Sequence, residues 1–421
     1  MNFALKFLIK NKSLHHSLFR RYLSQRFSII LALFIQNTIL VYWLYTITND
    51  VWSIGKLGLF EAIPAICFSL FSGHLVERRE KRTILVICTI SYVILTAGYV
   101  ALITLSERKM WSVHSITDCV YAGFFINGAI RAFLSPSSFS LLGLLVPRKR
   151  LANAATWSST SWQTGAVVGP LTGGVLIALM SVSKSLWVVL LIEILALLAI
   201  LTVPRQAIIK KEKEPVFKSL SQGLQFVFGT QIILAALALD MFAVLFGGAT
   251  ALLPAYARDI LNIGEVGYGW LRAAPGIGAI LMFMGLAWLP LRRHPGRKLL
   301  ISILGFGVCM IVFGLSKNAY ISFGALVLSG MLDAVSVVVR STILQLYTPD
   351  EMKGRVSAVN TMFISSSNEI GEVESGLTAK WMGTIPAVVF GGCMTLVVVG
   401  ITWIVAPSIR KFKLEDIERT N

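Results

Sequence analysis

The sequence predicts an all-α membrane protein with twelve transmembrane helices in two six-helix, pseudo-symmetric bundles. Hydrophobic residues make up 55% of the chain and charged residues only 14%. Apolar runs of about twenty residues, the length that a helix needs to cross a bilayer, recur along the whole chain. Only helices and closed barrels satisfy their backbone hydrogen bonds in lipid, and runs this long indicate helices.

Each predicted span is an apolar segment bounded by charged or turn-forming residues. The five cysteines lie in or at the edge of these segments, and their spacing indicates neither a metal site nor a disulfide framework. We therefore expect no metal and no cofactor. The spans are placed at residues 27–49, 56–76, 82–104, 118–146, 152–181, 185–203, 231–257, 266–291, 299–316, 318–347, 354–383 and 385–407.

The net charge of +17 would suggest nucleic-acid binding in a soluble protein, but its distribution indicates a membrane instead. Most of the 38 Lys and Arg residues lie in the two tails and in alternate loops. The positive-inside rule then places both termini in the cytoplasm. The lipid bilayer, and not nucleic acid, is the predicted partner of this charge.

Two segments are expected to lie at the membrane surface. Near the N-terminus, Leu14, Leu18 and Phe19 alternate with arginines, which suggests a basic amphipathic helix on the membrane; a disordered tail is the open alternative. Pro204–Ser219 is the longest hydrophilic interval and divides the spans six and six. We interpret it as a linker that leads into an interfacial helix.

The predicted domain organisation is a repeat of six helices. Residues 1–203 form an N-terminal bundle with a basic tail, 204–230 a cytoplasmic linker and interfacial helix, and 231–421 a C-terminal bundle with its tail. The halves echo each other, because Gly165 and Gly371 occupy equivalent positions in loosely matching segments. Parallel repeats of this kind place a substrate site between the halves, near the middle of the membrane.

A glycine stripe marks the fifth span. Gly165, Gly169 and Gly173 follow the spacing i, i+4, i+8, which leaves one helix face bare and lets a second backbone approach closely. Pro170 removes a backbone donor and bends the helix, and Gly174 completes the motif. The pattern resembles the motif on the fifth helix of exporters in the major facilitator superfamily; a plain close-packing helix is the alternative. We expect it to form a tight contact between the bundles.

The loop after the second span resembles the signature loop of the same superfamily, G-x-x-x-D-R-x-G-R-R/K. Glu77 stands where the pattern has aspartate, and Glu80 where it has glycine. The resemblance implies that Glu77 and Arg78 lock the cytoplasmic side by bridging to a facing helix N-terminus; a solvated positive-inside loop is the alternative. The matching residues are Gly73, Arg78, Lys81 and Arg82.

Arg131, Asp240, Asp333 and Arg340 are charged residues inside spans, where they must face the protein interior, a water-filled cavity or each other. Arg131 in the fourth span resembles an arginine found on that helix in proton-driven exporters, although the residues around it differ. Asp240 lies near the middle of the seventh span, and Asp333 and Arg340 share one face of the tenth. Structural ion pairs are the alternative interpretation.

The eleventh span carries the densest group of polar residues. Asn368 and Glu372 share one helix face, and Glu369 lies about 100° around the axis. Crowded carboxylates can bind and release protons near neutral pH, as a proton-coupled carrier requires. A structural polar network is the alternative, and Glu61 and Glu193 are weaker candidates for the same role.

The C-terminal half carries a closer resemblance. The segments Leu332–Gln345, Thr348–Asn360 and Ser367–Gly376 are similar to the enterobactin-exporter-like group of the superfamily. This resemblance implies a proton-coupled exporter of siderophores or other small molecules in the bacterial inner membrane. Substrate identity does not follow reliably from fold.

Together these features predict a monomeric secondary transporter that exports a small molecule by alternating access, in antiport with protons. A broad multidrug/proton antiporter is the first alternative, and an importer or lysolipid flippase of the same fold the second. A membrane receptor or scaffold that transports nothing is disfavoured, because intramembrane carboxylates would then cost stability without a use. We do not expect an enzyme, since no nucleophile–base pair, metal cluster or phosphate loop stands out.

Overall fold

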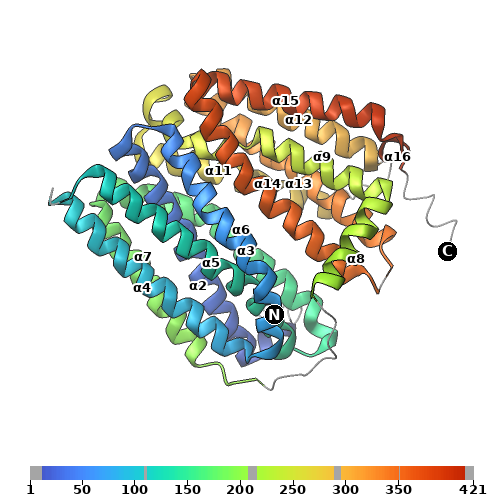
Figure 1. Cartoon of the computed structure of the whole chain (residues 1–421), viewed down its shortest axis with the longest axis horizontal. Helices are drawn as coiled ribbons and strands as arrows, with labels where there is room; N and C mark the ends of the chain where they lie inside the picture. The colour runs from blue at the N-terminus through green and yellow to red at the C-terminus, as the bar shows by residue number, and fades with distance from the viewer. Residues whose placement is uncertain (1–11, 109–110, 207–215, 289–294, 350, 413–421) are drawn as a thin grey trace, which may run out of the picture. The chain divides into compact units, whose positions relative to one another are not determined.

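The structure is a computed structural model that describes residues 12–108, 111–206, 216–288, 295–349 and 351–412 (Figure 1). These residues form helices and no strand. In the described part of the chain, eleven helices are long and apolar enough to cross a membrane. The helix α14 (Lys353–Met382), which matches the eleventh predicted span, has the necessary length but is interrupted by charged and polar side chains.

Unit 1 is one of two compact units and comprises residues 1–48 and 60–213. Long apolar segments without β-forming alternation give its helices their length, and α4 lies beside α7 (Figure 1). Its elements are η1 (Lys12–His15), α2 (Ser17–Thr48), most of α3 (Val51–Arg78), α4 (Lys81–Glu107), α5 (Val113–Leu145), η2 (Arg148–Arg150), α6 (Leu151–Leu179) and α7 (Val182–Leu201).

Unit 2 comprises residues 49–59 and 214–421, and so includes the first residues of α3. The proposed division at residues 203 and 230 stays a proposal, because part of the linker, residues 207–215, lies outside the described residues. The further elements of unit 2 are α8 (Val216–Gly229), α9 (Gln231–Gly247), η3 (Ala249–Leu252), α10 (Leu253–Ala255), the π-helix η4 (Tyr256–Ile260), α11 (Gly264–Trp288), α12 (Pro295–Leu315), α13 (Ala319–Tyr347), α14, α15 (Thr384–Val405) and α16 (Pro407–Lys411).

The N-terminal segment that we expected on the membrane surface is the first part of α2. Phe19 and Tyr22 are completely buried and belong to a core cluster with Leu141 of α5 and Ala154 of α6. The Tyr22 hydroxyl donates a 2.9 Å hydrogen bond to the carbonyl oxygen of Ser138. The surface-helix prediction is therefore wrong for these residues, because their apolar face packs against neighbouring helices.

The glycine stripe of α6 packs against α2 of its own unit. Gly165 faces Ile30. Gly169 faces Phe34, and a Cβ at position 169 would overlap that residue, so the two helices approach this closely because glycine has no side chain. Gly173 continues the same contact beside Thr38, while Pro170 and Gly174 are buried next to it. The close approach is as expected, but the contact between bundles that we predicted for these glycines is wrong, since they face α2 within unit 1.

The internal repeat appears as matching helix contacts. Gly371 of α14, the counterpart of Gly165, faces the backbone of Leu245 on α9. The helix α9 opens the membrane-spanning part of unit 2 as α2 opens that of unit 1. Each half thus packs its fifth spanning helix onto its first through a bare glycine face.

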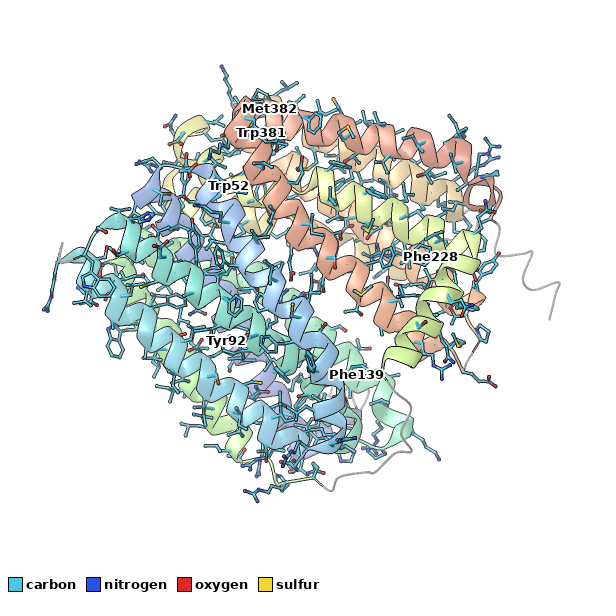
Figure 2. All side chains as sticks on the ribbon, viewed as in Figure 1. Trp52, Tyr92, Phe139, Phe228, Trp381 and Met382 are labelled. Carbon is cyan, nitrogen blue, oxygen red and sulfur yellow. The ribbon has the colours of Figure 1, made fainter. Side chains whose placement is uncertain are left out.

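The helix α8 stands where the interfacial helix is predicted. Its residue Val227 is fully buried in the core of unit 2, and Leu224 and Phe226 pack against that core. Phe228, labelled in Figure 2, is 61% exposed on the other side. This division into two faces agrees with an amphipathic helix, whose position at the membrane surface stays a prediction.

Candidate functional site

Two intramembrane charges of unit 2 form a buried ion pair. Arg340 of α13 pairs with Asp240 of α9, and their side chains are only 5% and 8% exposed. The hydroxyl of Ser336, one turn before Arg340, donates to the other oxygen of Asp240 at 3.3 Å. Helical spacing places Ser336 and Arg340 on one face of α13, so both reach the same carboxylate.

Asp333 lines a small cavity together with Asp240. The cavity holds about 10 Å³ of space and also contacts Ser302, Phe306 and Leu332. That space is close to the minimum for one water molecule, which needs polar partners such as these two carboxyls. The two aspartates, predicted on separate spans, therefore meet at one position between α9, α12 and α13.

The polar residues of α14 do not all lie together. Glu369 is 6% exposed, whereas Glu372 is half-buried and Asn368 is exposed. Glu372 lies against Gly58, where one of its carboxylate oxygens would be 3.1 Å from an added Cβ. Ser375 donates to the carbonyl oxygen of Gly248 at 3.0 Å. Asn368 and Glu372, which were expected to share one helix face, therefore differ in their exposure: Glu372 is partly buried and Asn368 is exposed.

Unit 2 also contains an arginine that the sequence analysis did not single out. Arg272 lies within α11 and donates a 2.6 Å hydrogen bond to the hydroxyl of Tyr268, one turn earlier. Tyr268 is completely buried. The spacing of Tyr268 and Arg272 on one helix face was the signal that could have identified this pair.

In unit 1 the intramembrane arginine also has an acidic partner. Arg131 of α5 donates to a carboxylate oxygen of Glu61 on α3 at 2.9 Å. The Glu61 side chain is 13% exposed and that of Arg131 39%, so the pair is open on one side. The sequence analysis expected a partner for Arg131 but ranked Glu61 only as a weak candidate.

The loop between α3 and α4 is fixed by Glu80, which stands where the signature pattern has glycine. Glu80 caps α4 by accepting from the backbone N–H groups of Arg82 and Thr83, at 3.1 and 2.7 Å. It also accepts from the backbone N–H of Gln206, beyond α7, at 3.1 Å. Burial raises the pKa of this carboxyl, but the hydrogen bonds outweigh burial, and the pKa lies below its ordinary value.

The other residues of this loop have different surroundings. Lys81 is nearly buried and donates to the carbonyl oxygen of Arg79 at 3.0 Å. The guanidinium of Arg82 donates to the carbonyl oxygen of Leu201, at the C-terminal end of α7, at 2.9 Å. Arg78 is exposed at the end of α3. Gly73 and Glu77 belong to α3, but their side-chain positions, and with them the predicted lock, lie outside the described residues.

A wider pocket lies on unit 1, on the side of α3 and α5. Its volume is about 420 Å³, within the range of small-molecule sites. Phe60 and Tyr121 stack in it with ring centroids 5.1 Å apart, and Asp118 supplies its carboxylate. Ala122, Phe125 and Ile126 complete an apolar lining.

Known proteins resemble this chain along nearly its whole length. The enterobactin exporter EntS of Shigella boydii serotype 18 (strain CDC 3083-94 / BS512) is 23% identical over 402 residues, covering 94% of each protein. The enterobactin exporter EntS of Escherichia coli O1:K1 / APEC gives the same identity and coverage.

Solved transporter structures share the fold. The inward-open xylose transporter XylE from E. coli matches with a TM-score of 0.70 and 16% identity, covering 96% of this chain and 99% of that one. A POT family transporter in complex with 5-aminolevulinic acid matches with a TM-score of 0.72 and 13% identity, covering 93% and 96%. The predicted fold of two six-helix bundles is confirmed by these likenesses.

The family assignment comes from the sequence itself. The family described as the Major Facilitator Superfamily matches residues 23–371, which is most of the chain. The family and the structural relatives are transporters and not enzymes, in agreement with the sequence analysis. The chain is therefore a multi-pass membrane transporter that belongs to the Major Facilitator Superfamily.

Proposed function

We propose that the protein exports a small molecule from the bacterial cytoplasm by alternating access, in antiport with protons. In this proposal the chain crosses the cell membrane with both termini in the cytoplasm and works as a monomer. The positive loops support that orientation. The similarity to enterobactin exporters over 94% of the chain supports the direction of transport.

The observation that carries the proposal is the buried pair of Asp240 and Arg340 with Asp333 beside it. Ionisable groups are costly inside a membrane and are kept there for ion pathways and proton relays. When Asp240 takes up a proton, it loses its negative charge, and the attraction between α9 and α13 weakens. Protonation at this position is therefore well placed to bias a conformational equilibrium.

A proton can drive export only if its affinity differs between the two conformations of the carrier. Glu369 and Glu372 of α14, together with Asn368, are proposed to contribute to the same path in unit 2. Arg131, paired with Glu61, is proposed to do so in unit 1. Glu77 and Arg78 are proposed to lock the cytoplasmic side, with Gly73, Lys81 and Arg82 shaping that loop.

The substrate is proposed to be a siderophore-like or drug-like small molecule. The pocket on unit 1 supports a partly aromatic compound, because stacked rings offer a flat apolar surface and Asp118 a single negative charge. A broad multidrug antiporter would use such a pocket equally well, and a screen of unrelated aromatic compounds separates the two. Export of many unrelated compounds would favour the multidrug alternative.

Transport by purified protein in proteoliposomes with an imposed pH gradient tests the proposal. We expect Asp240→Asn and Asp333→Asn each to abolish gradient-driven transport while substrate exchange without a gradient persists. Asp259→Asn serves as the matched control, because the Asp259 side chain is 50% exposed and lies outside the buried group. If both buried variants keep gradient-driven transport, the proton assignment is wrong.

A further inference from the structure

A third buried polar group lies in unit 1, away from the charges of unit 2. Glu193 of α7 is completely buried, and one of its oxygens accepts a 3.0 Å hydrogen bond from the hydroxyl of Thr96 on α4. Thr96 in turn accepts a 2.9 Å hydrogen bond from the side-chain amide of Gln36 on α2. Three helices thus hold one carboxyl in a fixed position.

The second oxygen of Glu193 has no hydrogen-bond partner among the described residues. An ionised carboxylate in this position would leave a full charge in an apolar interior with one neutral donor, which is strongly unfavourable. A neutral carboxylic acid needs much less compensation and carries its own proton to donate. The geometry therefore fits the protonated form.

Among the residues that the structure describes, the helices packed against α7 bring no cation to Glu193. The helix α6 contains no titratable side chain, and α2 contributes the neutral Gln36 at this level. Arg26 of α2 lies roughly 15 Å away along the helix axis and donates to Ser138. On α4, the group that contacts Glu193 is the neutral hydroxyl of Thr96.

Tyr92 of α4 does not supply a partner for this carboxyl. Its phenol is completely buried, and its hydroxyl has no hydrogen-bond partner within the described residues. Figure 2 shows Tyr92 on α4, among the helices of unit 1.

We propose that Glu193 is a proton-binding site whose carboxyl group holds its proton at neutral pH.

A proton fits this site better than a metal ion. A single carboxylate with one hydroxyl and one amide offers few oxygen ligands, whereas hard cations take about six or more. Binding of the proton does not depend on the proposed export function. Only its use during transport rests on that function, so the experiments below measure the proton directly and can fail independently of transport assays.

Infrared spectroscopy of the full-length protein in lipid detects the protonated acid. We expect a carbonyl band of a protonated carboxyl group at neutral pH, lost in Glu193→Gln and retained in Glu61→Gln. A wild-type spectrum without this band, or one that depends on added sodium ions, overturns the proposal. If Glu193→Gln does not fold, reaction of the wild type with an apolar carbodiimide, mapped by mass spectrometry, gives the same answer. Modification of Glu193 supports the neutral acid, and an unmodified Glu193 contradicts it.

Discussion

Arg340 and Asp240 form an ion pair between α13 and α9 that is almost completely shielded from solvent. The sequence places Asp333 two turns from Arg340 on the same helix face, yet the carboxylate that contacts the guanidinium comes from another helix. Asp333 instead shares the adjoining cavity with Asp240. The arrangement gives one arginine a direct acidic partner and a second acid nearby.

Removing one partner of this pair should destabilise the protein strongly. Asp240→Asn leaves the Arg340 charge buried without its carboxylate, and we expect a loss of about 3–5 kcal/mol. Thermal unfolding in detergent, monitored by circular dichroism, measures the loss. Asp259→Asn is the control, because the Asp259 side chain is 50% exposed.

The double variant Asp240→Asn with Arg340→Gln separates pairing from simple packing. With both charges removed, we expect it to be more stable than the sum of the single variants by about 0.5–3 kcal/mol. Strict additivity of the two single changes would mean that the buried contact contributes no coupling energy.

Alanine substitutions at Gly169 of the glycine stripe and at Gly98 of α4 should change stability in opposite directions. In a helix, Gly→Ala normally stabilises by about 1 kcal/mol. At Gly98 an added Cβ meets nothing within 4 Å, so Gly98→Ala should show that gain. At Gly169 an added Cβ would overlap the Cβ of Phe34. Gly169→Ala should therefore lower the free energy of unfolding by about 1–3 kcal/mol. A stabilised Gly169→Ala variant, in the same unfolding assay, would contradict the packing of α6 on α2.

The capping role of Glu80 predicts a pH-dependent contribution to stability. Its pKa is lowered in the folded state, so the stabilisation is fully present above pH about 4.3, the ordinary value, and is lost as the pH falls through the folded value. Glu80→Ala should lower stability by about 0.5–2 kcal/mol at pH 7, as loss of a helix cap does.

The same substitution should weaken the fall in melting temperature as the pH is lowered from about 4.3 through the lower folded-state pKa of Glu80. Glu351→Ala, which removes an exposed acid from a different loop, is the control and should change neither quantity. A Glu80→Ala variant with an unchanged acid response would show that the hydrogen bonds to Arg82, Thr83 and Gln206 do not hold the carboxylate.

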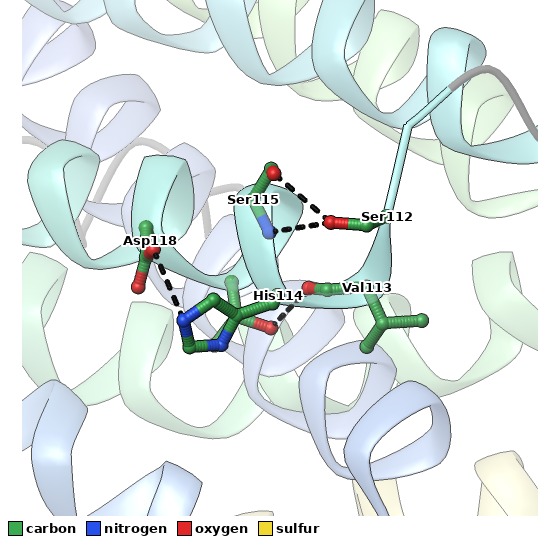
Figure 3. A network of polar contacts seen from close by, with 6 residues as sticks. Ser112, Val113, His114, Ser115 and Asp118 are labelled. Carbon is green, nitrogen blue, oxygen red and sulfur yellow. Dashed lines mark hydrogen bonds and ion pairs between the residues drawn. The ribbon is translucent and has the colours of Figure 1, made fainter.

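The proposed orientation can be tested at two exposed loop positions. At the start of α5, Ser112 caps the helix through Ser115, and the ring of His114 faces Asp118 at 3.8 Å (Figure 3). The His114 side chain is 91% exposed, and Lys149 at the other end of α5 is exposed as well. In a cysteine-free background, His114→Cys should react with an impermeant maleimide on intact cells, and Lys149→Cys only after permeabilisation. The opposite pattern would reverse the topology and remove the argument for export.

The sequence predicted the membrane-spanning elements because they depend on local properties. Apolar segments of sufficient length must become helices in lipid, wherever their neighbours lie. The same local reasoning identified Arg131, Asp240 and Arg340 as charges that need partners. It also located the glycine face of α6, since helical spacing alone brings Gly165, Gly169 and Gly173 into line.

Local reasoning was wrong where a partner had to be chosen. Phe19 was expected at the membrane surface but lies in the core, because an apolar helix face packs equally well on lipid or on protein. The glycine stripe was expected to join the bundles, but it faces α2. Glu80, which breaks the signature pattern of its loop, caps α4 instead.

The sequence by itself therefore determined which segments span the membrane, which faces are bare and which charges cannot remain alone. Only the tertiary structure decided that Arg340 pairs with Asp240, that Arg131 pairs with Glu61, and that Gln36, Thr96 and Glu193 form one chain of hydrogen bonds. The physical reason is that helical periodicity follows from backbone geometry within a few residues. Contacts between helices depend on the packing of surfaces that are far apart along the chain.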